Sequence, residues 1–88
     1  MKLKYSFEAV DMGDEIIYVP VGKGAANVSG VLKLNREGQE IIELLKEETS
    51  EEAIVSALAA KYENDRTILV GYVRSVLDRL NAASLLVK

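Results

Sequence analysis

The sequence has no cysteine and no histidine among its 88 residues. Without cysteine there can be no disulfide, no thiolate nucleophile and no thiolate metal ligand. Without histidine the chain also lacks the most common general base and the most common transition-metal ligand. Few catalytic mechanisms remain open to so short a chain, so we expect no enzymatic activity, no bound metal and no cofactor.

Long apolar runs are missing as well. No stretch approaches the ~18 residues that a membrane-spanning helix needs. The first ten residues alternate polar and apolar positions, where a signal peptide would be continuously apolar. We therefore expect a cytoplasmic protein without a membrane partner. The length predicts one domain, residues 1–88, and 49% hydrophobic with 28% charged residues is typical of a globular chain.

The charge is acidic overall and unevenly distributed. The net charge is −3 and the isoelectric point is near 4.9, which disfavours nucleic acid as a partner because phosphate contacts require a basic surface. Between residues 37 and 52 there are seven acids and one base, and between residues 66 and 88 four bases and one acid. Solvated helix faces explain most of the acidic half.

The N-terminal part predicts a β-hairpin. Residues 3–9 alternate with a period of two, and their apolar positions define one buried face. Residues 11–14 supply a turn in which Gly13 can adopt a positive φ at little cost. Residues 15–21 are rich in β-branched side chains and form the return strand, with Pro20 near its end.

The glycine-rich segment 22–30 invites comparison with a phosphate-binding loop, but the pattern fails. Such a loop ends in Gly-Lys-Ser/Thr and leads into a helix. Here Gly22-Lys23 is followed by another glycine, and the residues after Gly30 predict a third strand, 31–34. We interpret the segment as a mobile connection between strands.

Three helices are predicted after this strand. Asn35 is placed to cap the first, residues 36–47, by accepting from free amides of the first turn. Thr49 and Glu52 fit a capping box at the start of the second. Asn64 or Asp65 caps the third, which runs to about Asn81.

Residues 84–87 then return to an extended apolar tail. Strands followed by helices with short connections predict an α+β fold, in which a three-stranded antiparallel N-terminal sheet precedes three helices in a winged helix-turn-helix-like arrangement.

The third helix carries an unusually wide apolar surface. Its apolar side chains sweep across an arc of roughly 160°, whereas a one-sided surface helix shows about 100°. Two explanations are open: the helix serves a second surface beside the core, or it is simply buried on more sides. The residues of the arc are Leu69, Val70, Tyr72, Val73, Val76, Leu77 and Leu80.

A set of mostly structural positions, spread over nearly the whole chain, forms a further pattern. The positions are Leu34-Asn35, Ile41, Ile42, Leu44, Leu45, Ser50-Glu51-Glu52-Ala53-Ile54, Leu58, Tyr62, Val73, Leu77, Leu80 and Leu85-Leu86. Together they resemble the PqqD family, named for a pyrroloquinoline quinone biosynthesis protein. Two departures are Ser84, where such proteins often have glycine, and Gly71 within the third helix.

This resemblance implies a non-catalytic recognition element of ribosomal peptide modification systems. In the family, the leader segment of a precursor peptide lies along the third strand as an added strand and is presented to a modifying enzyme, commonly a radical SAM protein. An open strand edge offers unpaired backbone groups to such a peptide. On this basis we predict that the peptide contacts Val31, Leu32, Lys33 and Leu34 on the strand and Val70, Val73, Arg74 and Leu77 on the third helix.

Three alternatives remain open at this stage. The opposite flank of the third helix, with Ile68, Tyr72 and Arg79, could face the peptide instead. A winged-helix nucleic-acid binder would share the same arrangement, although acidic helices repel phosphate. An open strand edge could also pair with its own copy, so the chain is expected to be a monomer or a weak homodimer.

Overall fold

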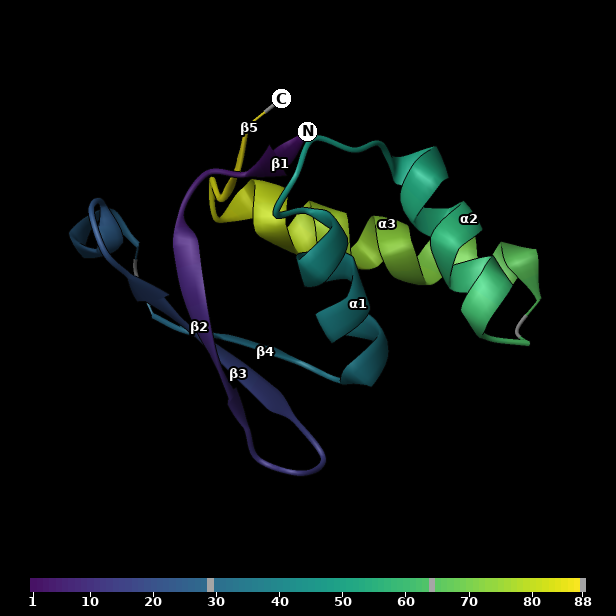
Figure 1. Ribbon diagram of the computed structural model, residues 1–88. Helices are drawn as coiled ribbons and strands as arrows, with labels where there is room; N and C mark the ends of the chain where they lie inside the picture. The colour runs from purple at the N-terminus through teal and green to yellow at the C-terminus, as the bar shows by residue number, and fades with distance from the viewer. Residues whose placement is uncertain (29, 64, 88) are drawn as a thin grey trace.

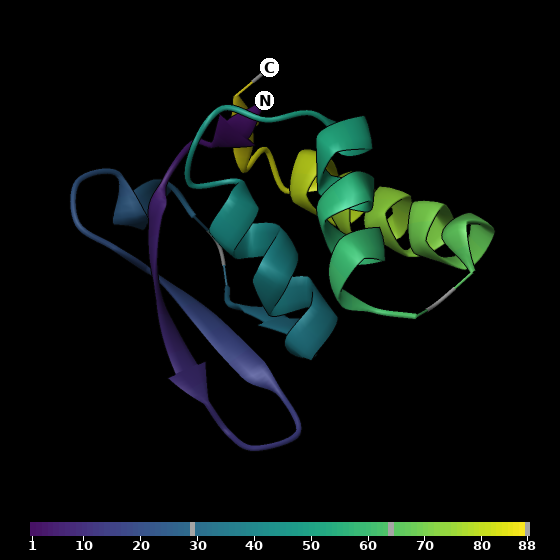
Figure 2. The same cartoon turned by 45° about the vertical axis from the view of Figure 1, so that its right-hand side comes forward.

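The computed structural model describes residues 1–28, 30–63 and 65–87 and has an α+β fold (Figure 1). One antiparallel sheet has the strand order β2–β3–β4, formed by β2 (Ser6–Asp11), β3 (Ile16–Val21) and β4 (Leu32–Leu34). A second sheet pairs β1 (Lys2–Leu3) with β5 (Leu86–Val87), so the two ends of the chain lie side by side (Figures 1 and 2). The predicted three-stranded antiparallel sheet is confirmed.

Three α-helices follow the sheet, as the sequence predicted. They are α1 (Arg36–Leu44), α2 (Glu51–Lys61) and α3 (Arg66–Ala82), and a short 3-10 helix, η1 (Ala25–Asn27), lies in the connection between β3 and β4. Helix α3 packs mainly on α2 and also touches α1. The arrangement agrees with a winged helix-turn-helix-like fold.

The core lies between one face of the sheet and the helices. Ile16 and Tyr18 on β3 are paired in register with Leu34 and Leu32 on β4, so their side chains share the face that packs on the helices. The wide apolar arc of α3 is largely used here, since five of its seven residues are buried: Leu69, Val73, Val76, Leu77 and Leu80. This favours the second explanation of the arc, in which the helix is buried on several sides.

The first strand differs from the prediction. Residues 3–9 do not form one strand, because the chain bends at Lys4 and Tyr5 and divides into β1 and β2. Two hydrogen bonds to distant segments cause the break: the Leu3 amide donates to the Leu45 carbonyl and the Lys4 amide donates to the Leu85 carbonyl, both at 2.8 Å. Alternation of apolar residues carries no information about such long-range partners.

Helix α1 ends at Leu44, three residues earlier than predicted. Its N-cap is Asn35 as expected, with the side-chain oxygen accepting from the Gly38 amide at 3.0 Å. At the other end the Leu45 amide is shared between the carbonyls of Ile41 and Ile42, which tightens the last turn. The Leu45 carbonyl accepts from the Leu3 amide of β1 and not from a further turn of the helix.

The predicted cap of α2 is wrong by one residue. Ser50, not Thr49, is the N-cap, and its hydroxyl accepts from the Ala53 amide at 3.1 Å. Thr49 is instead held by the N-terminal residue, because its amide donates to the Met1 carbonyl and its carbonyl accepts from the Met1 amino group. With alanine at the third helical position, the reciprocal bond of a capping box cannot form.

Asp65 caps α3 by accepting from the Thr67 amide at 2.7 Å, in agreement with one of the two predicted caps. The other, Asn64, lies outside the described residues. The helix runs to Ala82, one residue past the predicted end.

The C-terminal end of α3 explains why glycine is favoured at position 84. Ser84 has φ +59°, in the left-handed region. Its amide donates to the Asn81 carbonyl and the Leu85 amide donates to the Leu80 carbonyl at 2.9 Å, the two bonds of a Schellman motif. This motif turns the chain so that β5 can reach β1.

We therefore expect Ser84→Gly to stabilise the protein. A side chain in the left-handed conformation costs about 1 kcal/mol that glycine does not, although glycine also makes the unfolded chain more flexible. The free energy of unfolding in urea should rise by roughly 0.5–1 kcal/mol. A lower value than for the parent would contradict the helix end described here.

A second prediction concerns Tyr18, whose side chain is 2% exposed. Burial, with smaller contributions from Glu43 and Glu40, raises the pKa of the Tyr18 hydroxyl from 10.0 to about 12. The folded state therefore keeps the proton to higher pH than the unfolded state does. This contribution to stability is complete below pH 10 and is lost as the pH rises toward about 12.

Urea unfolding at a series of alkaline pH values should show stability falling across this window. The Tyr18 hydroxyl has no hydrogen-bond partner among the described residues, so Tyr18→Phe should raise the stability at neutral pH by about 1 kcal/mol. The variant should also lose stability less steeply above pH 10. An unchanged alkaline slope would contradict this account of Tyr18.

Candidate functional site

The third strand of the main sheet, β4, has one open edge. It pairs with β3 on one side, and it is the last strand in the order β2–β3–β4. The Lys33 carbonyl accepts a hydrogen bond from the Arg79 guanidinium of α3 at 3.3 Å. Because the N–H and C=O of one residue in an antiparallel strand point to the same side, the N–H and the C=O of Lys33 both point away from β3. This edge is therefore available to a further strand.

Two clefts include residues of this strand, one at its N-terminal end and one between β4 and α3. The first has a volume of about 190 Å³ and lies at the N-terminal end of β4. Its walls are mainly apolar, and Val31, one of its lining residues, is 54% exposed. Ala83 and Leu85, which follow α3, and Phe7 of β2 also line it. An apolar side chain of a bound molecule would be removed from water in this cleft, which favours binding.

The second cleft, about 250 Å³, continues along β4 toward the start of α1 and is more polar. Four side chains of α3 line it at helical spacing, so they share one face of the helix. They are Tyr72, Ser75, Val76 and Arg79, and across from them lie Lys33, Leu34, Asn35 and two acids of the β2–β3 turn, Asp14 and Glu15.

Tyr72 fixes the distance between α3 and the end of β4. Its hydroxyl donates to the Asn35 side-chain oxygen, the same atom that caps α1. Burial raises the pKa of the Tyr72 hydroxyl, and the negative charge of Glu37 adds to this effect. Tyr72 therefore stays protonated and donates at physiological pH. Its hydrogen bond links α3 to Asn35, the residue that follows β4.

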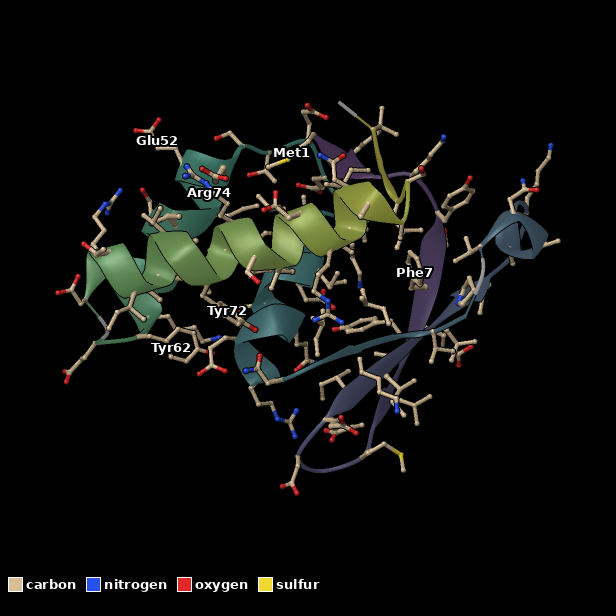
Figure 3. All side chains as sticks on the ribbon, turned by 180° about the vertical axis from the view of Figure 1, so that it is seen from behind. Met1, Phe7, Glu52, Tyr62, Tyr72 and Arg74 are labelled. Carbon is tan, nitrogen blue, oxygen red and sulfur yellow. The ribbon has the colours of Figure 1, made fainter. Side chains whose placement is uncertain are left out.

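Helix α3 presents a different surface on its other side. The Arg74 guanidinium binds the Glu51 carboxylate of α2 at 2.9 Å and lowers the pKa of that carboxyl. Figure 3 shows Arg74 and Tyr72 on opposite sides of the helix, with Arg74 toward α2. The side that faces β4 is thus the one with Tyr72 and Arg79, which the sequence left as an alternative.

The structure separates the predicted site residues into two groups. The four strand residues lie together at the open edge, with Val31 and Lys33 exposed, Leu32 half-buried and Leu34 buried at 6% exposure. The four helix residues line neither cleft along β4. Val73 and Leu77 are buried in the core, Val70 is half-buried and Arg74 faces α2. Their role in binding a peptide stays a prediction.

Ser75 was not predicted from the sequence as a site residue, and Arg79 was named only on the alternative flank of the helix. Together with Tyr72 they lie at spacings of three, four and seven residues and so share one side of the helix. In the sequence this row could not be distinguished from an ordinary solvated face. Its proximity to β4 depends on how α3 rotates about its own axis, which the core packing decides.

A larger cavity, about 400 Å³, lies near the other edge of the sheet. Six of its ten lining residues come from the segment 3–9, which bends between β1 and β2. It is therefore a pocket beneath that bend and not a groove along a strand. For this reason we place the candidate site at β4.

Within residues 1–28, 30–63 and 65–87, no cluster of three or more acidic side chains could hold a metal ion. None of the three described helices is long and apolar enough to cross a membrane.

Comparison with protein families gives a match to the family described as coenzyme PQQ synthesis protein D (PqqD), over residues 16–86. The chain belongs to the PqqD family. The resemblance inferred from the sequence is therefore confirmed, and the matched region of this PqqD-family chain contains β3, β4 and all three helices. A comparison with curated proteins finds no significant match.

Among solved structures, this PqqD-family chain is similar to TbiB1 in complex with the TbiA(beta) leader peptide. The two chains are 27% identical, and their superposition has a TM-score of 0.70. The match covers 97% of this chain and 93% of TbiB1, so the similarity extends over the whole fold, including β4 and the face of α3 beside it.

Proposed function

We propose that this chain is a non-catalytic recognition protein that binds the leader segment of a ribosomally made precursor peptide. In this proposal the leader adds a strand to the open edge of β4 and fills the groove beside α3. The observation that carries it is the outward-facing backbone N–H and C=O of Lys33, at the edge of a fold that resembles a protein solved in complex with a leader peptide. An extended peptide would satisfy that edge through backbone hydrogen bonds and place alternate side chains in the two clefts.

The proposal includes a partner that acts on the bound peptide. The resemblance to the PqqD family points to a radical SAM enzyme as that partner, with the whole chain working as one recognition domain in the cytoplasm. The modifying chemistry then belongs to the enzyme. This chain holds the substrate peptide in an extended conformation. Because the peptide is already ordered, less conformational entropy is lost when the enzyme binds the peptide.

Nucleic acid is a less suitable partner than a peptide. Two arginines of α3 that could contact phosphate are already engaged, Arg74 with Glu51 and Arg79 with the Lys33 carbonyl. The acidic α1 and the negative net charge would repel a polyanion.

Titration of ¹⁵N-labelled protein with the leader of a precursor encoded beside its gene tests the proposal. We expect the largest amide shifts at residues 32–34 and on the Tyr72–Arg79 side of α3. The core part of the same precursor, without its leader, serves as the control and should leave the spectrum unchanged. Absence of shifts with any such leader would overturn the proposed function, and shifts confined to β2 would place the peptide at the wrong edge.

A further inference from the structure

Arg79 differs from the other arginines whose contacts the structure defines. Arg36 pairs with Asp11, and Arg74 pairs with Glu51, each at 2.9 Å. Within the described part of the chain, no carboxylate lies within 4.0 Å of the Arg79 guanidinium. Its charge is directed instead to a neutral acceptor, the Lys33 carbonyl.

That contact lies where an incoming strand has to bind. The Lys33 carbonyl is an outward-facing acceptor of β4, so the backbone N–H of an added strand would be directed to the same oxygen. At 3.3 Å and on the protein surface, the Arg79 bond is long and weak, and a well-aligned backbone donor can replace it. Once replaced, the guanidinium would remain at the level of Lys33 without the one hydrogen bond that the structure shows for it.

We propose that Arg79 selects an acidic side chain in the bound peptide, exchanging the Lys33 carbonyl for that carboxylate when the strand is added. This inference rests on the proposed function. An arginine fork binds a carboxylate through two parallel hydrogen bonds, which are stronger than its bond to a single neutral carbonyl. In the free protein the same guanidinium covers part of the open edge and so opposes pairing between two copies.

The surroundings define where the acid must lie. Asp14 and Glu15 line the same cleft, and the pairing of Ile16 with Leu34 places both acids beyond Leu34, toward α1. An acidic side chain of the peptide would be repelled there and favoured one step back, beside Lys33. The apolar cleft at Val31 and Leu32 adjoins this position. The peptide should therefore carry an acidic residue next to the apolar residue that fills this cleft. It should not carry an acid at the peptide end that lies near the β2–β3 turn.

Selection from a random twelve-residue peptide library, displayed on phage, tests this assignment. The full-length parent, Arg79→Gln and Arg66→Gln are used in parallel. Arg66→Gln makes the same charge change at the other end of α3, away from both clefts. Peptides selected by the parent and by Arg66→Gln should be enriched in Asp or Glu at one position beside apolar residues. Peptides selected by Arg79→Gln should not.

A selected peptide is then synthesised with Glu and with Gln at the enriched position, and both are titrated against each protein. The Gln peptide should bind the parent roughly tenfold more weakly than the Glu peptide, as the loss of a charged hydrogen bond predicts. Both peptides should bind Arg79→Gln with similar affinity. The Arg79 side chain is exposed, and a thermal melt of Arg79→Gln should match that of the parent.

The outcomes separate this inference from the proposed function. Peptides that shift the amides of β4 but show no preference for an acid, or keep that preference with Arg79→Gln, overturn the role of Arg79 and leave the proposed function in place. If the parent binds neither library peptides nor the precursor's leader, the proposed function fails and the role of Arg79 fails with it.

Discussion

Lys33→Pro is expected to weaken binding of the leader peptide by at least roughly tenfold, because proline removes a backbone donor and its ring obstructs the edge where the peptide pairs. The N–H and C=O of Lys33 point away from β3, as the contact of the carbonyl with Arg79 indicates. Proline at this position therefore leaves the β3–β4 hydrogen bonds in place, and proline is tolerated on the unpaired side of an edge strand. Isothermal titration with the leader measures the effect.

Lys33→Ala is the matched control. It removes the exposed side chain and keeps the N–H, so the affinity should change by no more than about twofold if the backbone carries the interaction. Equal losses for the two variants would contradict strand addition at this position and would assign the interaction to the lysine side chain.

Strand addition can also be tested by changing the peptide, which avoids any effect of proline on folding of the protein. Methylation of one backbone nitrogen at a time removes single donors from the leader. In an added strand the peptide's amides point alternately toward β4 and away from it. Affinity should therefore fall at every second position, and a uniform response along the peptide would contradict the pairing.

The largest expected effect on stability is at Gly38, in the first turn of α1. This glycine is buried, and a Cβ built on it would lie 2.7 Å from the Leu34 Cβ and 3.1 Å from the Tyr72 hydroxyl oxygen. Neither the Leu34 Cβ nor the backbone beside it can move without shifting β4. Gly38→Ala should therefore lower the free energy of unfolding by roughly 1–3 kcal/mol, the usual cost of overpacking, despite alanine's better helix propensity.

Gly71 in α3 provides the matched substitution. A Cβ at this position meets nothing within 4 Å, so alanine should add helix propensity without a clash. Gly71→Ala is expected to raise the free energy of unfolding by about 0.5–1 kcal/mol. Urea unfolding of the two variants gives the comparison directly. If Gly38→Ala were as stable as Gly71→Ala, the close approach of α1, β4 and Tyr72 would be contradicted.

Local signals in the sequence predicted much of this fold, because several elements are determined by residues close together in the chain. The β-branched residues of β3, the Asn35 cap and the apolar spacing in α1 all specify nearby structure. The errors come from partners far away in the sequence. Thr49 fails to cap α2 because Met1 binds its backbone, and the first strand breaks because Leu45 and Leu85 accept from its amides.

The site was harder to predict than the fold for a related reason. An apolar arc of roughly 160° leaves two flanks of α3 as possible walls of the groove, and periodicity does not say which one faces β4. The contacts of two side chains decide it: Arg74 binds Glu51 of α2, and Arg79 binds the Lys33 carbonyl. The departure at Ser84, by contrast, has a clear physical meaning, because the residue adopts the left-handed conformation that favours glycine.

Hydrogen exchange at β4 tests the central claim most directly. The Lys33 amide faces the open edge, whereas the amides of Leu32 and Leu34 alternate with it and face β3. Saturation with the leader peptide should slow exchange at Lys33 and change Leu32 and Leu34 far less. A Lys33 amide that still exchanges at its free rate in the saturated complex, or new protection that appears in β2 instead, would contradict strand addition at β4.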